Sequence, residues 1–149
     1  GKRLDEELHR AQRQPESHFS LVMIDLDDFK RVNDNFGHDV GDDVLKGVAL
    51  TVKSSVRATD IVARFGGEEF ILLLPNTHLE SARILSKKIS NSIKLESKNY
   101  SPKSQFQYIT LSIGIISLTC SDTFKESLIK VDHALYTAKK SGKNCIKTL

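Results

Sequence analysis

The chain has no tryptophan, one methionine, two cysteines and three prolines among its 149 residues. Cys120 and Cys145 do not form a zinc-ligand pattern, and so small a number of cysteines excludes a disulfide-stapled scaffold. A cleavable signal segment and a long apolar run are also absent from the sequence. These absences favour one globular domain over residues 1–149, in a reducing cytoplasmic setting without direct membrane contact.

The net charge of +3 is unevenly distributed, because the first half of the chain is acidic and the second half is basic. An acidic half can hold cations and a basic half can meet phosphates, a combination that suits a polyphosphate substrate, although solvated surface charge explains most of these residues. The lysine clusters at 87–88 and 139–143 are not interleaved with aromatic residues that could stack on bases. Nucleic acid is therefore not an expected partner.

Hydrophobic periodicity predicts alternating strands and helices. We expect a first helix over Leu4–Arg13, later helices at 28–35, 40–56, 78–93 and 124–140, and strands at 19–25, 61–65, 70–74 and 106–117. Gly66 and Gly67 are expected to supply positive φ angles for a tight hairpin between two of the strands. The core order β-α-β-β-α-β, with an extra helix at each end, predicts a mixed α/β (α+β) fold of the ferredoxin-like class.

Acidic residues follow the first strand and the predicted hairpin. The connection from strand 19–25 to strand 61–65 is long enough for parallel pairing, which would put Asp25 and the hairpin 66–69 at one edge of the sheet. Carboxylates gathered at one point favour Mg²⁺, which also binds substrate phosphates, so a nucleoside triphosphate with magnesium is the expected occupant.

The alternative is that Asp25, Asp27 and Asp28 cap the next helix and that Glu68 and Glu69 are solvated turn residues. For Asp28, a role at the metal site and a role as a helix cap are equally favoured by the sequence. For Asp25 and Glu68 capping or simple solvation fits poorly, because each begins or ends an apolar strand.

The segment Arg64–Phe70 (RFGGEEF) resembles the signature hairpin of the diguanylate cyclases, in its GGEEF form. Asp25–Asp42 (DLDDFKRVNDNFGHDVGD) resembles the upstream block of that family at the expected distance, and the likeness resumes at Ile113-Gly114 and Ala138–Asn144. The resemblance implies a GGDEF domain of bacterial signalling, related in fold to nucleotide cyclase and polymerase palm domains. Such a domain condenses two GTP molecules into cyclic di-GMP and releases pyrophosphate.

The resemblance covers nearly the whole chain but not the short motif, containing aspartate and glycine, that usually precedes the first helix in the family. We therefore expect a domain excised from a larger protein, whose upstream sensory or regulatory domain lies outside this chain. That parent protein can be membrane-anchored even though the domain itself is expected in the cytoplasm.

The resemblance also implies a role for each residue that matches the family motifs. Asp25, the backbone carbonyl of Leu26 and Glu68 would hold Mg²⁺ or Mn²⁺, and Glu68 and Glu69 would be catalytic, helping to deprotonate the attacking 3′-hydroxyl. The residues that would bind substrate are Lys30, Asn33, His38, Asp42, Gly66, Gly67, Lys139 and Lys143.

Among these residues Asn33 and Asp42 would contact guanine, and Lys143 stands where the family often has arginine. The residues alone favour another interpretation of the first pair, in which Asn33 caps a turn and Asp42 caps helix 43–56. His38 is either structural or adjacent to the substrate.

Two further expectations concern partners. The product is two-fold symmetric, so two domains must face each other as a transient antiparallel homodimer. Arg57 and Asp60 form an R-x-x-D pattern at the separation from the hairpin that the family's inhibitory product site has, although a helix-end arginine and a turn aspartate would look the same.

Two rival functions stay open on the sequence alone. One is a catalytically weak GGDEF domain that senses GTP or cyclic di-GMP. The other is a protein-interaction domain whose acidic edge docks a basic partner, without nucleotide chemistry.

Overall fold

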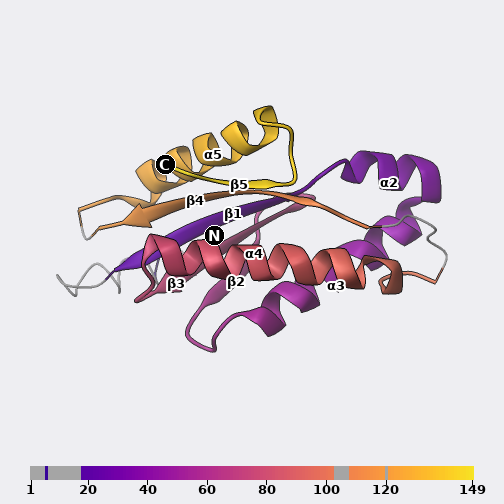
Figure 1. Cartoon of the computed structure of the whole chain (residues 1–149), viewed down its shortest axis with the longest axis horizontal. Helices are drawn as coiled ribbons and strands as arrows, with labels where there is room; N and C mark the ends of the chain where they lie inside the picture. Colours follow the sequence, from indigo (N-terminus) through magenta and orange to yellow (C-terminus); the bar gives the residue numbers. More distant parts are fainter. Residues whose placement is uncertain (1–5, 7–17, 103–107, 120) are drawn as a thin grey trace.

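One sheet positions the functional segments of the molecule. The computed structural model describes Glu6 and residues 18–102, 108–119 and 121–149, and in that part of the chain the strands form a five-stranded sheet in the order β2-β3-β1-β4-β5 (Figure 1). The strands are β1 (Phe19–Leu26), β2 (Ile61–Arg64), β3 (Glu69–Pro75), β4 (Leu111–Leu118) and β5 (Cys145–Thr148). β4 and β5 pair in parallel, and the other neighbours pair antiparallel.

The order β2-β3-β1-β4, with helical connections after β1 and after β3, is that of a ferredoxin-like βαββαβ core. The predicted mixed α/β fold class is therefore confirmed. β5 was not expected from the sequence, because its four half-buried residues are too short a run to stand out from the loop before them.

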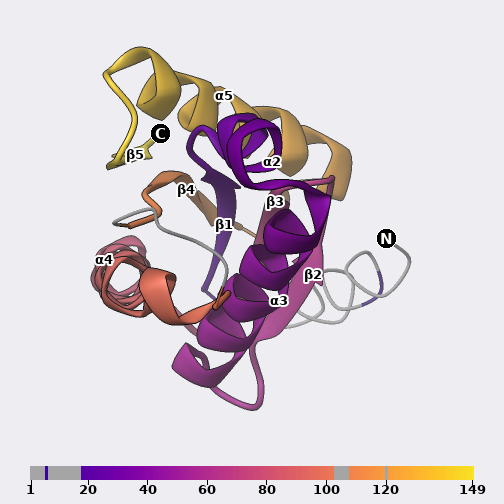
Figure 2. The same cartoon turned by 90° about the vertical axis from the view of Figure 1, so that its right-hand side faces the viewer.

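The helices cover both faces of the sheet. They are α2 (Phe29–Phe36), α3 (His38–Ser55), α4 (Leu79–Glu96), the short 3-10 helix η1 (Ser97–Asn99) and α5 (Phe124–Lys140). Figures 1 and 2 show α3 and α4 on one face and α5 on the other. The extra helix predicted at 124–140 is confirmed, whereas the helix predicted over Leu4–Arg13 lies outside the described residues.

β1 is the central strand and is buried along its whole length. Its alternate residues serve two cores, since Val22 and Ile24 pack with residues of α3 and α4, and Leu21 and Met23 pack with residues of α5. A strand covered on both faces needs apolar side chains at successive positions. This explains the unbroken apolar run Leu21–Ile24 in the middle of β1.

α5 is placed by a cap at its start and by a glycine beneath it. The Thr123 side chain accepts a hydrogen bond from the Glu126 N–H at 3.1 Å, and Glu126 bonds back to the Thr123 N–H, so the helix begins with a capping box. On β4, a Cβ at Gly114 would lie 2.8 Å from the Val131 carbonyl oxygen of α5. Gly114 therefore allows α5 to lie close against the sheet.

The structure corrects the predicted pairing of strands. β1 and β2 do not pair, because β3 lies between them and is antiparallel to both. Two strands that are each antiparallel to a third run in the same direction, so their carboxyl ends still share one edge of the sheet. The expected position of Asp25 and the hairpin is right, although the pairing that predicted it is wrong.

Two local expectations are also wrong. Neither Gly66 nor Gly67 has a positive φ, and the only described glycines that do are Gly37 and Gly142. Of the strand predicted at 106–117, residues 106–107 lie outside the described residues and 108–110 precede β4, which begins at Leu111. The Ile109 N–H donates to Ser97 Oγ at 2.8 Å, and the Thr110 carbonyl accepts from the Asp27 N–H at 2.9 Å. The backbone of 109–110 is thus hydrogen-bonded outside a strand ladder.

None of the described helices has both the length and the apolar character that a membrane-spanning helix requires.

Candidate active site

Acidic residues meet at the edge of the sheet where β1 ends and β3 begins. Asp25 is the register partner of Glu69 across the β1–β3 ladder, and the Leu26 N–H donates to the Glu68 carbonyl oxygen at 3.2 Å. The structure therefore brings together the predicted metal ligands Asp25, Leu26 and Glu68 and the second predicted catalytic residue, Glu69.

Burial and mutual repulsion raise the pKa values of these carboxylates. Burial is the main cause for Asp25, which exposes only 6% of its surface. Burial also raises the pKa of Glu68 and of Glu69, and the charge of Asp25 raises both further. Such a group of carboxylates attracts cations and has a raised affinity for protons.

Two lysines from the end of α5 approach this acidic edge. The Lys139 ammonium donates a hydrogen bond to Asp25, and Lys143, in the loop after α5, donates to Asp28 at 2.8 Å. Burial lowers the pKa of Lys139, but the hydrogen bond to Asp25 and the charges of Asp25, Glu69 and Glu68 together outweigh that effect, so the net shift is upward. The structure thus joins the predicted phosphate-binding lysines to the predicted metal site.

Asp28 does not behave as the helix cap that one interpretation of the sequence assigned to it. It occupies the position before α2 with a left-handed φ of 54°, and its side chain makes no capping bond. The hydrogen bond to Lys143 instead holds the pKa of Asp28 below its ordinary value.

The hairpin between β2 and β3 is organised by Arg64. Its guanidinium donates to the Gly66 carbonyl at 3.3 Å and to the Gly67 carbonyl at 2.5 and 3.2 Å. A Cβ at Gly67 would meet no atom within 4 Å, so this backbone is open to an approaching ligand. Sequence reasoning gave no role to Arg64; its position directly before the glycine-containing turn is the signal that could have indicated one.

The predicted base-binding residues lie on α2 and α3. A Cβ at Gly41 would overlap Asn33 Oδ1, so the Asn33 amide lies across the backbone next to Asp42. Asp42 lines a groove of about 680 Å³, together with Leu45, Arg64 and Phe70. Asp42 does not cap a helix, because α3 begins at His38 with Gly37 before it.

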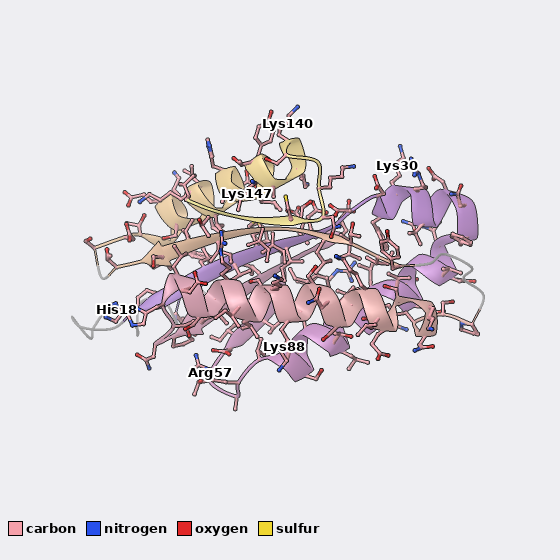
Figure 3. The ribbon with its side chains drawn as sticks, in the orientation of Figure 1. His18, Lys30, Arg57, Lys88, Lys140 and Lys147 are labelled. Atoms are coloured by element: carbon pink, nitrogen blue, oxygen red, sulfur yellow. The ribbon has the colours of Figure 1, made fainter. Side chains whose placement is uncertain are left out.

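Lys30 and His38 are exposed residues near the starts of α2 and α3. Figure 3 shows Lys30 on the outer side of α2. Neither side chain is hydrogen-bonded to the described residues of the acidic edge, so the structure does not join them to the cluster that Lys139 reaches.

Comparison with known proteins identifies this arrangement. The family model described as diguanylate cyclase, GGDEF domain, matches residues 1–145. The chain belongs to this family. Diguanylate cyclase DgcM of Escherichia coli K12 is 42% identical over 126 residues, which are 85% of this chain and 30% of DgcM. Response regulator PleD of Caulobacter vibrioides is 38% identical over 128 residues, again 85% of this chain and 28% of PleD.

Among solved structures, the GGDEF domain of DgcB from Caulobacter crescentus in complex with c-di-GMP superimposes with a TM-score of 0.87 at 27% identity. That match covers 99% of this chain and 88% of the DgcB chain. The chain spans less than a third of the length of the curated relatives DgcM and PleD.

The oxygen donors of this GGDEF domain fit a hard divalent cation. Carboxylates with raised pKa values share a single described ammonium, that of Lys139, and a small oxygen-binding cation would relieve their repulsion. As the described side chains stand, no three His, Cys, Asp or Glu residues are gathered closely enough to hold a metal ion. The predicted ligand set does not require three such residues, because it consists of Asp25, Glu68 and the backbone carbonyl of Leu26.

The GGDEF domain carries its R-x-x-D pattern at the opposite end of β2 from Glu68. The Asp60 side chain is 1% exposed and accepts from the Arg57 N–H at 2.8 Å, while Arg57, 57% exposed, forms an ion pair with it at 3.3 Å. The Arg57 guanidinium also donates to the Thr77 hydroxyl at 2.6 Å and the Pro75 carbonyl at 2.8 Å. The pattern is thus a fixed structure that presents one face of the guanidinium to solvent.

The basic residues of α4 divide between two faces. Ser81 and Leu85 line a small cavity with Arg57, and Lys88 follows them at helical spacing, on the side where Figure 3 shows both Lys88 and Arg57. Arg83 and Lys87 line a different groove, beside β5. Of the α4 cations, Lys88 is therefore the one on the Arg57 side.

Proposed function

We propose that this GGDEF domain is a diguanylate cyclase that condenses two GTP molecules into cyclic di-GMP with release of pyrophosphate. The observation that carries the proposal is the meeting of Asp25, Glu68 and Glu69 with Lys139 at one edge of the sheet. Acidic groups for a cation and basic groups for phosphates there share one small region, as phosphoryl transfer requires.

The relatives support the same reaction. DgcM is named a diguanylate cyclase, and the structure of the DgcB GGDEF domain contains c-di-GMP. The GGEEF spelling of the hairpin is compatible with activity in a relative, because a solved Vibrio cholerae domain is described as an active GGEEF domain.

The residues of the acidic edge would bind the metal and accept the proton of the attacking 3′-hydroxyl. Asp25, the Leu26 carbonyl and Glu68 would hold Mg²⁺ or Mn²⁺, which when bound lowers the pKa of the attacking 3′-hydroxyl and offsets charge on the phosphates. Glu68 and Glu69 have raised pKa values and so are better bases than ordinary carboxylates. One of them would accept the proton of the 3′-hydroxyl.

Other residues would orient the nucleotide. Lys139 and Lys143 would exchange their carboxylate partners for phosphate oxygens, and Lys30 would add a further positive charge. The open backbone at Gly67 would let phosphates approach closely, and Gly66, beside the Glu69 carboxylate, would add backbone without a side chain. Asn33 and Asp42 would recognise guanine through its polar edge, with His38 nearby.

One domain supplies one nucleotide site, so the reaction needs two domains facing each other as an antiparallel homodimer. An upstream domain of the parent protein would control this encounter. We also propose that cyclic di-GMP inhibits the enzyme by binding at Arg57 and Asp60, because the Arg57 side chain is 57% exposed and its guanidinium, on exchanging its present partners, can bond guanine acceptors in pairs through its in-plane N–H groups.

The deciding experiment incubates the purified domain with GTP and Mg²⁺ and measures cyclic di-GMP and pyrophosphate by chromatography. A diguanylate cyclase forms both. Binding of GTP or cyclic di-GMP without turnover would instead favour a sensing domain, and binding of neither would favour a protein-interaction domain.

A further inference from the structure

Asp27 is a buried carboxylate that the reaction as described does not use. It follows the last residue of β1 and exposes 8% of its surface. Its Oδ1 accepts from Ser112 Oγ at 2.5 Å, and its Oδ2 accepts from Thr110 Oγ1 at 2.6 Å and from the Asn144 N–H at 2.9 Å. The view of Asp27 as a solvated helix cap is therefore wrong, since it joins the end of β1 to β4 and to the loop before β5.

The segment that Asp27 holds is the loop 141–144, between α5 and β5. Gly142, Lys143 and Asn144 have φ angles of 108°, 64° and 46°. Left-handed backbone is unfavourable for lysine and only better tolerated by asparagine, so two such residues in succession need external support. The Lys143 N–H is bonded within α5, to the Ala138 carbonyl at 3.1 Å, whereas the Asn144 N–H is bonded to Asp27.

Three ties connect this end of α5 and its loop to the end of β1. Two of them are side-chain ion pairs, Lys139 with Asp25 and Lys143 with Asp28. These two lysines would bind phosphates, so both pairs must open when a triphosphate arrives. The bond from the Asn144 backbone to Asp27 involves no phosphate-binding group, and it is the tie that can persist while the lysines change partners.

We propose that Asp27 is a positioning residue for the triphosphate: it anchors the loop 141–144 so that Lys139 and Lys143 stay in place when they leave their carboxylates for phosphate oxygens. The proposal rests on the proposed function, and it assigns Asp27 no contact with substrate or metal. Its consequence is specific, because the loss of Asp27 should weaken binding of phosphates and leave binding of guanine intact.

The test measures dissociation constants of a non-hydrolysable GTP analogue and of GMP by calorimetry, for the parent domain and for Asp27→Ala. We expect Kd for the triphosphate analogue to rise about tenfold, as for the loss of a hydrogen bond to a charged group, with Kd for GMP unchanged. Ser112→Ala is the matched control, because it removes a donor to the same carboxylate and leaves the Asn144 tie in place. It should bind both nucleotides as the parent does.

Asp27→Asn should restore parental binding, since its carbonyl oxygen can take the place of Oδ2 and accept from the Asn144 N–H and the Thr110 hydroxyl, while the Ser112 hydroxyl reorients to accept from its amide. If Asp27→Ala does not fold, Asp27→Ser takes its place, because it keeps a hydroxyl at this polar position and removes Oδ2, the oxygen that accepts from the Asn144 N–H.

Equal loss of affinity for GMP and for the triphosphate, or an equal effect in Ser112→Ala, would show a merely structural role and overturn the proposal. If the folded Asp27→Ala or Asp27→Ser variant binds the triphosphate analogue as tightly as the parent domain does, the proposal is overturned as well. Failure of the proposed function looks different, because it is seen in the parent domain alone, which would then bind no guanine nucleotide or bind it without forming cyclic di-GMP.

Discussion

Asp25 serves two cations in turn. In the structure its carboxylate is bonded to the Lys139 ammonium, and in the proposed reaction it is a metal ligand. Charge balance explains how Asp25 could pair with the ammonium first and bind a metal later. The Lys139 ammonium would offset the repulsion among the clustered carboxylates until metal and phosphates arrive together. Lys139 is then free to meet the phosphates that arrive with the metal.

Glu68→Gln should abolish product formation and stabilise the metal-free domain. The amide is a weaker ligand for a cation and cannot accept a proton as a carboxylate does, so formation of cyclic di-GMP should fall below detection by chromatography. The amide also removes one buried charge that Asp25 repels, so Tm measured in EDTA should rise at pH 7.

The control for this prediction is the pH dependence of the Tm difference between Glu68→Gln and the parent domain. Because folding raises the pKa of Glu68, the folded state favours the protonated form, and its stabilising effect is present below the ordinary pKa of 4.5 and is lost as pH rises through the raised value. The advantage of the Gln variant should therefore shrink as pH falls toward 4.5. Near-normal turnover in this variant would contradict the assigned role.

Asp42→Ala tests base recognition at the groove on α3. If the carboxylate accepts from the guanine N–H edge, its loss should raise KM for GTP and narrow the preference over ATP, at a cost of about 1–3 kcal/mol. Steady-state kinetics with both nucleotides measure this. Because Asp42 is exposed and caps no helix, Tm should stay unchanged, and an unaltered GTP/ATP ratio would show that the residue does not contact the base.

At the scale of elements, β2 separates the proposed catalytic and inhibitory sites. Arg57 and Asp60 precede the strand, and the hairpin with Glu68 follows it. A ligand at Arg57 therefore lies at the other end of β2 from the acidic edge, and inhibition that holds domains apart or out of alignment would need no contact with that edge.

Arg57→Ala should relieve product inhibition without lowering the initial rate. Progress curves of the parent are expected to bend as cyclic di-GMP accumulates, and those of the variant should stay straight for longer. Lys88→Ala, on the Arg57 side of α4, should show a weaker effect of the same kind, and Lys87→Ala, on the other face, should show none. Curvature that persists in Arg57→Ala would exclude this site.

The contact between α5 and β4 predicts a stability effect. A Cβ at Gly114 would collide with the α5 backbone at Leu135 and Val131, so Gly114→Ala must push the helix off the sheet. We expect a loss of about 1–3 kcal/mol in the free energy of unfolding, measured with urea. Gly67→Ala is the matched control, because its Cβ would meet no atom within 4 Å and should leave stability unchanged.

At the scale of the whole molecule, each domain holds one set of acidic and basic groups for a reaction that joins two nucleotides. Specific activity should therefore rise with protein concentration, and the initial rate should approach second-order dependence on protein at low concentration. Initial rates over a dilution series at saturating GTP measure this. Fusion to a dimeric coiled coil should remove most of the dependence, and a specific activity that stays constant on dilution of the unfused domain would argue against a transient dimer.

The sequence by itself determined the fold class, most helix and strand positions and the candidate residues at the acidic edge. Apolar periodicity, caps and turns act over a few residues, so β1 and the bounds of α5 can be read from local pattern. The same reasoning placed Asp25 and the hairpin at one edge, since only strand direction was needed for that conclusion.

Tertiary structure alone decided which side chains meet there. β3 separates β1 from β2, Lys139 lies on Asp25, and Asp27 holds the Asn144 backbone. These last two contacts join residues 114 and 117 positions apart, and no local pattern encodes them. They form because β1 and α5 pack on one another through a shared core, which carries their polar ends to the same place.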